Sequence, residues 1–280
     1  MKKVGFIEYY LDEWHANNYP PMIEELSGGE YKVCYAYAKT ESPKEGAMTN
    51  KEWAEKFGVE LLDSIEEVIE KSDCLVVLSP DNPEMHEELC HLPLMSGKLT
   101  YVDKTFAPDK ETAIRIFEHA DKHNTKCFSS SALRFATEWK DIDTDNIYTL
   151  YSEGGGLLDI YIIHQLEPIM GLMKSRVKRI MALNDFDHPS FVVEFADGRY
   201  VHLHHCRVKG QKFRITTSDK ENKGNHFVVE SDFFRLFLEA MLEFFKTGVV
   251  PVPHEQTIDV IAAREKAIEA VKTPFQWVEV

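Results

Sequence analysis

The first 130 residues alternate short apolar segments with helix-compatible segments, and this alternation constrains the fold more than any other feature of the chain. The apolar segments are rich in Val, Ile, Leu, Tyr and Phe. Strands are expected at residues 4–7, 31–37, 74–79, 99–103 and 126–130. Helices are expected between them, at residues 14–26, 51–57, 65–70, 84–95 and 110–123. Because strands that alternate with helices form parallel βαβ units, we predict a doubly wound α/β sheet.

The pattern changes after about residue 140. Three glycines at 154–156 precede an apolar run of helical length at 157–173. β-prone stretches follow at residues 177–183, 191–195, 200–208, 213–217 and 226–229, and helix-like runs close the chain at 233–246 and 257–271. This order predicts an α+β domain with an open, mostly antiparallel sheet. We therefore expect two domains, residues 1–125 and 126–280.

Composition excludes several classes of partner. The chain has 280 residues and a formal charge of −15, which disfavours binding to nucleic acid or to an anionic membrane surface. No apolar stretch is long enough to cross a bilayer, and the start of the chain lacks a signal-peptide core. The five cysteines are scattered without a C-x-x-C pair, so we expect free thiols and a cytoplasmic protein.

A lysine stands at the end of one expected buried strand. Residues 99–103 lead directly into Lys104, which follows Asp103. In open α/β sheets, ligands bind at the carboxyl ends of the strands. A partly desolvated lysine beside an acid can bind or protonate a carbonyl oxygen, so Lys104 is a candidate for acid–base chemistry.

The turn after the first strand lacks the glycines of a dinucleotide site. The usual G-x-G-x-x-G lets backbone N–H groups and a helix N-terminus hold a pyrophosphate. Here residues 8–13 read EYYLDE, in which the acids repel phosphate and the tyrosines block close approach of the backbone. After the second strand, Lys39 and Thr40 could suit a 2′-phosphate, although a lysine there is usually only solvated. These motifs do not support a nicotinamide cofactor.

One strand of the second domain carries candidate metal ligands. Alternation places His202, His204 and Cys206 on one strand face, and His226 is the remaining candidate. Ligands two residues apart on one strand rarely converge on a tetrahedral ion without help from elsewhere. We therefore expect a polar sheet face and no metal site.

Several segments, in order, resemble the motifs of the Gfo/Idh/MocA oxidoreductases. Residues 78–86 (LSPDNPEMH) are similar to the family's T-P-N-x-x-H, and residues 96–105 (SGKLTYVDKT) resemble A-G-K-x-V-x-x-E-K-P. Residues 132–135 (ALRF) are similar to the family's arginine–phenylalanine pair. Residues 154–171 resemble G-G-G-x-L-x-D-x-x-x-H-x-x-D, and residues 195–198 match F-A-D-G. No single segment is specific, but their order and spacing together are.

The resemblance implies a Rossmann-like domain that binds NAD or NADP and a C-terminal domain for substrate binding and oligomerisation. It implies an NAD(P)-dependent oxidoreductase that acts on a sugar-, polyol- or related hydroxyl-bearing small molecule. It further implies a homodimer or homotetramer formed through the C-terminal sheet.

The resemblance also implies roles for individual residues. Lys104 would be the active-site lysine, and His164 would exchange the proton of the substrate hydroxyl. Arg134 would lie near the nicotinamide. The residues implied along the cofactor are Ile7, Glu8, Tyr9, Tyr10, Lys39, Ser79, Pro80, Asn82, His86, Asp103, Lys104 and Arg134.

The helix that carries His164 departs from the family pattern. Asp159 precedes His164 by five residues instead of four, which turns the two side chains toward different helix faces. Tyr161 and Glu167 do share a face with His164. The catalytic candidates are Lys104, His164, Asp159 and Tyr161.

Two alternatives stay open. The acidic first turn supports a non-catalytic ligand sensor or regulatory protein on the same fold, one that has lost normal dinucleotide binding. A metal-dependent activity at His202, His204 and Cys206 is the weaker alternative.

Overall fold

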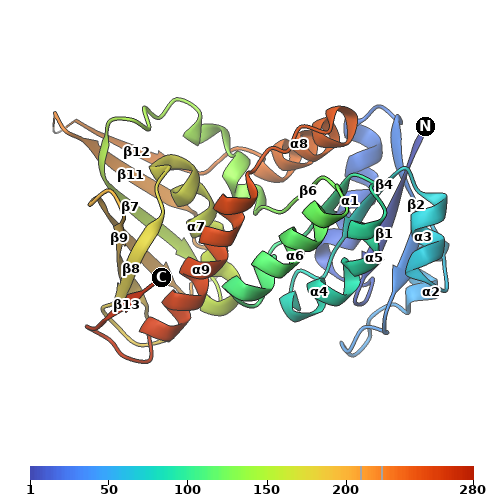
Figure 1. Ribbon diagram of the computed structural model, residues 1–280, viewed down its shortest axis with the longest axis horizontal. Helices are drawn as coiled ribbons and strands as arrows, with labels where there is room; N and C mark the ends of the chain where they lie inside the picture. The colour runs from blue at the N-terminus through green and yellow to red at the C-terminus, as the bar shows by residue number, and fades with distance from the viewer. Residues whose placement is uncertain (209, 222) are drawn as a thin grey trace. The chain divides into compact units, whose positions relative to one another are not determined.

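The computed structural model describes residues 1–208, 210–221 and 223–280, which divide into two compact units (Figure 1). The first unit comprises Met1–Ser130 and Phe237–His254, and the second comprises Ser131–Leu236 and Glu255–Val280. The expected ranges, 1–125 and 126–280, therefore differ from the observed division, because a late segment of the chain returns to the first unit.

The first unit is built on a six-stranded parallel sheet, as predicted, in the order β3-β2-β1-β4-β5-β6. Its strands are β1 (Lys2–Glu8), β2 (Tyr31–Ala38), β3 (Glu60–Leu61), β4 (Cys74–Val77), β5 (Thr100–Val102) and β6 (Cys127–Phe128). The helical elements before β6 are α1 (Trp14–Leu26), α2 (Asn50–Phe57), α3 (Ile65–Lys71), η1 (Pro83–Met85), α4 (His86–Leu89), α5 (His91–Met95) and α6 (Lys110–Lys122). Every residue of β4 and β5 is buried, which is typical of parallel strands covered on both faces.

Helix α8 (Phe233–Thr247) explains why a late segment belongs to the first unit. Its phenylalanine stripe packs on residues of the parallel sheet. The ring of Phe237 lies 5.1 Å from that of Tyr101, and the ring of Phe244 lies 5.0 Å from that of Phe128. Phe237, Phe244 and Phe245 are buried, and the core that this helix enters is the one built by the start of the chain.

The second unit contains a seven-stranded, mostly antiparallel sheet, as predicted, in the order β12-β11-β7-β10-β9-β8-β13. Its strands are β7 (Ile147–Gly155), β8 (Val177–Ala182), β9 (Ser190–Phe195), β10 (Tyr200–Cys206), β11 (Arg214–Asp219), β12 (Gly224–Val228) and β13 (Trp277–Glu279). Among the described strands of this second sheet, only the central pair β7 and β10 is parallel. The helical elements are η2 (Ala132–Phe135), η3 (Thr137–Trp139), α7 (Leu158–Met173) and α9 (His254–Ala270), and α7 packs against β7 and β10 (Figure 1).

Strand β7 is central to this sheet, yet the sequence pattern does not predict it. It carries exposed residues, Tyr148 and Tyr151, that do not follow a simple alternation with its buried residues, and it ends in Gly154 and Gly155. Glycine weakens a strand signal and usually indicates a loop. Pairing with β10 and β11 on its two sides forms the strand despite this composition.

Two findings bear on the environment of the chain. None of the helices in the described ranges is long and apolar enough to cross a membrane. All five cysteines are free thiols.

We expect Phe237→Ala to destabilise the first unit by about 3–5 kcal/mol, because it leaves a cavity beside Tyr101. Phe275→Ala is the matched control, since Phe275 is 71% exposed. Urea unfolding followed by tryptophan fluorescence measures both variants. Equal losses of stability in the two variants would contradict the assignment of α8 to this core.

Candidate functional site

The N-terminus of α1 is capped by the carboxylate of Glu13. This carboxylate accepts hydrogen bonds from the backbone N–H of His15, at 2.7 Å, and from that of Ala16. In βα units that bind dinucleotides, the N–H groups at this helix N-terminus hold the pyrophosphate. The Glu13 carboxylate therefore occupies the space at the first N–H groups of α1, which we call the pyrophosphate position.

Two other backbone N–H groups of the same turn already donate to side-chain oxygens of this chain. The N–H of Tyr9 donates to Glu8 Oε1 at 2.7 Å, and the N–H of Leu11 donates to Asn50 Oδ1 at 3.0 Å. Tyr10 and Leu11 are buried, so the turn is packed by its own side chains. Glu8, Tyr9 and Tyr10, which the resemblance implies along the cofactor, lie at the end of β1 and in the turn after it, and the folded turn does not fit a pyrophosphate.

The acids of this turn lie in an environment that disfavours further negative charge. Burial, reinforced by Glu13, raises the pKa of Glu8 well above its ordinary value. Burial also raises the pKa of Glu13 to about 7, although His15 and the capped N–H groups oppose this shift. Within the described residues, Glu8 Oε2 is buried without a hydrogen-bond partner. A dinucleotide phosphate here would meet carboxyl groups that are themselves poorly solvated.

Asp103, which follows β5, receives three donors. Its Oδ2 lies 2.5 Å from His15 Nδ1, and its Oδ1 accepts from the Tyr101 hydroxyl and from the Lys104 N–H, both at 2.8 Å. Burial alone would raise the pKa of Asp103, but His15, Lys104 and Tyr101 together outweigh it and lower the pKa to about 2. Asp103 is therefore a fixed carboxylate at the carboxyl edge of the sheet.

Lys104 lies beside this carboxylate and is only 8% exposed. Its ammonium Nζ donates to the backbone oxygen of Pro80 at 3.3 Å. Ser79, next to Pro80, turns the chain with a φ of 111° and donates its hydroxyl to the backbone oxygen of Asn82. The loops after β4 and β5 are thus joined around Lys104.

The remaining implied cofactor residues of the first unit have structural contacts. His86 is fully buried, and its ring nitrogens lie 3.0 and 3.1 Å from the backbone oxygens of Leu78 and Phe106. Ile7 is a buried strand residue. Lys39 forms an ion pair with Glu88, so its charge is already matched.

His164 belongs to the second unit, on α7. Its Nδ1 lies 2.6 Å from the hydroxyl oxygen of Ser131, and its ring lies 5.3 Å from that of Tyr161. The expected shared face of Tyr161 and His164 is therefore present. Asp159 is exposed, and its backbone oxygen accepts from Arg264 Nε at 2.8 Å.

Glu167 contacts Ser131 directly, and Arg134 is the ion-pair partner of Glu167. Glu167 is buried, accepts the Ser131 N–H at 3.3 Å and forms an ion pair with Arg134 at 2.7 Å. Arg134 also donates to Gln256. These contacts lie within the second unit, and they orient the residue that bonds to His164.

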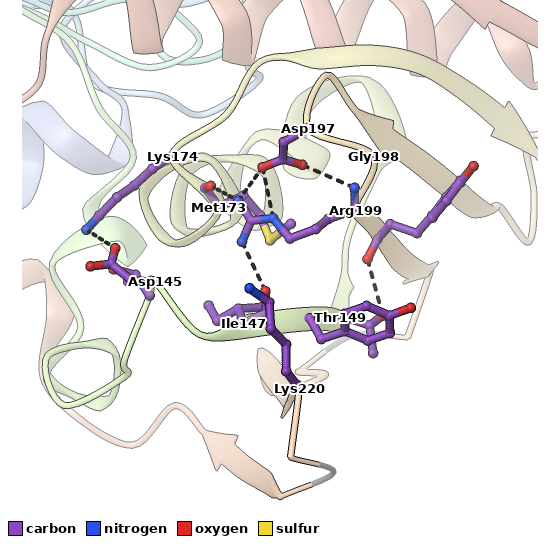
Figure 2. A pocket seen from close by; sticks show the side chains of 12 residues that line it. Asp145, Ile147, Thr149, Met173, Lys174, Asp197, Gly198, Arg199 and Lys220 are labelled. Carbon is purple, nitrogen blue, oxygen red and sulfur yellow. Dashed lines mark hydrogen bonds and ion pairs between the residues drawn. The ribbon is translucent and has the colours of Figure 1, made fainter.

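A cavity of about 830 Å³ lies at the C-terminal end of α7 in the second unit (Figure 2). Figure 2 shows Asp197 facing Arg199 and Lys174 facing Asp145, and these pairs are 2.7 and 3.5 Å apart. These four charged side chains therefore form ion pairs with one another. Of the residues that the structure describes, the cavity lining includes none of the predicted site residues.

The histidines of the outer sheet face bond to neighbouring hydroxyls. His204 Nδ1 lies 2.9 Å from Ser190 Oγ, and His226 Nδ1 lies 2.8 Å from Thr216 Oγ1. In the described part of the chain, no group of three or more His, Cys, Asp or Glu side chains is arranged to hold a metal ion.

Sequence reasoning missed Glu13 as a cap, His15 and Ser131. The position of Glu13, directly before an expected helix, is a weak capping signal, because Glu is not a preferred N-cap residue. The contact of His15 with Asp103 joins residues 88 positions apart, and only the fold brings them together.

No protein-family model and no curated protein sequence matches the chain. Among solved structures it is similar to a probable dehydrogenase from Thermotoga maritima, with a TM-score of 0.80 and 15% identity over 99% of this chain and 98% of that chain. It is similar to scyllo-inositol dehydrogenase from Lactobacillus casei, with a TM-score of 0.77 and 15% identity over 99% and 98%. It is also similar to GenD2 from gentamicin A biosynthesis in complex with NAD, with a TM-score of 0.76 and 13% identity over 100% and 97%. The chain therefore has the fold of Gfo/Idh/MocA-type dehydrogenases, as the sequence motifs predicted.

We expect Glu13→Gln to remove a pH dependence of stability. A pKa raised from 4.5 to about 7 means that folding retains a proton which the unfolded chain has lost. The free energy of unfolding of the original protein should fall, relative to the Gln variant, by up to about 3 kcal/mol as pH rises from about 4.5 to 7. Urea unfolding at a series of pH values measures this difference, and parallel curves for the two proteins would contradict it. The Gln side chain retains an oxygen that can accept from the helix N–H groups, so the comparison isolates the titration.

Proposed function

On the fold of the Gfo/Idh/MocA-type dehydrogenases, we propose that this chain is a ligand-binding protein that has lost the ordinary site for NAD or NADP. Its ligand is a small hydroxylated molecule of the sugar or polyol class. The observation that carries the proposal is the Glu13 carboxylate at the N-terminus of α1, which takes the N–H groups that would hold a pyrophosphate.

The ligand class is supported by the fold and by the retained polar residues. Scyllo-inositol dehydrogenase is among the similar structures, which suggests a polyol. Lys104 supplies an ammonium donor and His164 an imidazole, and both groups can bond to hydroxyl or carbonyl oxygens. The cytoplasmic location and the dimer or tetramer implied by the resemblance stay predictions.

A second candidate function is an NAD(P)-dependent oxidoreductase acting on CH–OH groups. It is favoured by the presence of both Lys104 and His164 and by the NAD complex among the similar structures. Under this alternative the dinucleotide would be held by contacts other than those of the first turn.

Titration with NADH and with NADPH separates the two functions. We expect no saturable change in dinucleotide fluorescence at concentrations up to millimolar, because the N–H groups of His15 and Ala16 at the start of α1 are already bonded to Glu13. GenD2, whose solved structure holds NAD, serves as the positive control. Saturable binding at micromolar concentration would support the oxidoreductase and contradict our proposal.

We expect Glu13→Ala to create an anion site that the original protein lacks. The substitution exposes the N–H groups of His15 and Ala16 while costing about 1 kcal/mol in lost capping. Inorganic pyrophosphate, titrated against tryptophan fluorescence, to which Trp14 at the start of α1 contributes, should bind to the variant and not to the original protein. Glu24→Ala is the matched control, since Glu24 is an exposed acid of the same helix. Equal responses in all three proteins would show that Glu13 does not block this position.

A further inference from the structure

The cavity of about 830 Å³ at the C-terminal end of α7 is lined by Lys220, a lysine without an ion-pair partner among the described residues. We propose that this cavity binds a small organic monoanion, a carboxylate carried on a ring-shaped body. Lys220 and Arg199 hold the carboxylate, and Tyr148 packs on the body. The inference goes beyond the proposed function, because it concerns a separate site that needs neither Lys104 nor His164.

The cavity is formed entirely by the second unit. Its lining residues come from β7 and the segment before it, the end of α7, the β9–β10 hairpin and the residue after β11. The rise along α7 from His164 to Met173, its last residue, is about 14 Å. The volume lies within the range of cavities that bind small molecules. The cavity is therefore large enough for an organic ligand and is separate from His164.

Arg199 neutralises groups that would otherwise repel an anion. Its guanidinium donates to the backbone oxygen of Met173 and, at 3.2 Å, to that of Ile147. The last carbonyls of a helix carry partial negative charge, and Arg199 bonds one of them. The guanidinium also donates to Asp197 Oδ2, from Nε at 2.9 Å and from Nη2 at 2.7 Å. Within the described part of the chain, these four bonds leave one of its five N–H groups for a ligand.

The charge of Asp197 is matched by the same arginine. Burial alone would raise the pKa of its carboxyl, but the hydrogen bonds from Arg199 outweigh burial and lower that pKa. Oδ1 accepts the backbone N–H of Arg199 at 3.1 Å, while Oδ2 accepts from the guanidinium. Both carboxylate oxygens are therefore bonded within the β9–β10 hairpin.

Lys220 provides a positive charge that no acid matches. It follows β11 directly, it is exposed, and in Figure 2 its side chain extends into the cavity toward Arg199. It has no hydrogen bond or ion pair with any residue that the structure describes. Two cations that line one cavity repel each other, and an anion bound between them relieves that repulsion.

The charge of the lining favours a monoanion. Three cationic side chains, Lys174, Arg199 and Lys220, face two acidic ones, Asp145 and Asp197. Lys174 and Asp145 are 3.5 Å apart and 57% and 88% exposed, so this solvated pair contributes little on its own. The excess of one positive charge matches one carboxylate. A phosphate or pyrophosphate would bring additional negative charge, which the two acids repel.

Aromatic side chains provide a surface for the body of the ligand. Tyr148 is 61% exposed and Tyr200 is 40% exposed, and both line the cavity. An exposed aromatic ring gains free energy when a flat or ring-shaped group covers it, because both surfaces lose contact with water. The lining therefore favours an organic carboxylate over a bare inorganic anion.

Isothermal titration calorimetry of the full chain with benzoate tests the proposal. We expect one benzoate to bind per chain, saturably, at millimolar concentration. Lys220→Ala should weaken this binding about tenfold, because it removes a charge-assisted hydrogen bond. Lys223→Ala is the matched control, since Lys223 is an exposed lysine of the same β11–β12 connection that does not belong to the described lining of the cavity. Lys220 is itself exposed, so its replacement leaves the core intact.

Two further ligands separate charge from shape. Benzyl alcohol has the ring of benzoate without its charge, and phenyl phosphate has the ring with more negative charge. Both should bind more weakly than benzoate, and Tyr148→Ala should weaken the binding of benzoate. Absence of saturable benzoate binding, equal affinity in Lys220→Ala and Lys223→Ala, or a comparison ligand that binds as tightly as benzoate overturns the proposal. These outcomes are independent of the dinucleotide titrations.

Discussion

The contact between the Glu13 carboxylate and the N-terminus of α1 is the interaction on which the first unit's chemistry depends. It satisfies helix donors that would otherwise need an outside anion, and it does so with a group from the same chain. Once that acid is in place, the turn can close over Tyr10 and Leu11, and the space that a phosphate would require is filled. The fold of a dehydrogenase is thus retained while its usual anion site is occupied from within.

Burying several acids at one sheet edge creates two different electrostatic environments. Asp103 stays ionised because three donors converge on it, whereas Glu8 has a raised pKa because burial dominates and its neighbour Glu13 adds negative charge. Burial raises the pKa of Glu13 to about 7. Environments that separate the pKa values of neighbouring acids are a common feature of sites that move protons. The acids at this edge of the sheet therefore differ in pKa because their surroundings differ.

The sequence predicts the layers of this fold better than its site. The helix expected at residues 14–26 has those bounds, and the missing glycines already indicate that the first turn differs from the usual glycine-rich pyrophosphate site. The sequence does not reveal the contacts of this turn, because Glu is not a preferred N-cap residue and because His15 and Asp103, which form a pair, are 88 positions apart. The same limit applies to Ser131, whose hydroxyl oxygen lies 2.6 Å from His164 Nδ1 although the two residues are 33 positions apart in the chain. Local patterns identify helices and strands, whereas partners distant in the chain are defined only by packing.

The return of Phe237–His254 to the first unit has a consequence for how the protein is made. During synthesis, the parallel sheet emerges first, but the phenylalanines that cover Tyr101 and Phe128 are translated more than a hundred residues later. Until then the nascent chain exposes an aromatic surface, which is the kind of surface that chaperones bind. A fragment ending near residue 130 would carry the same exposed surface permanently and would be prone to aggregate. Each unit is therefore complete only after a late segment has joined it, Phe237–His254 in the first unit and Glu255–Val280 in the second.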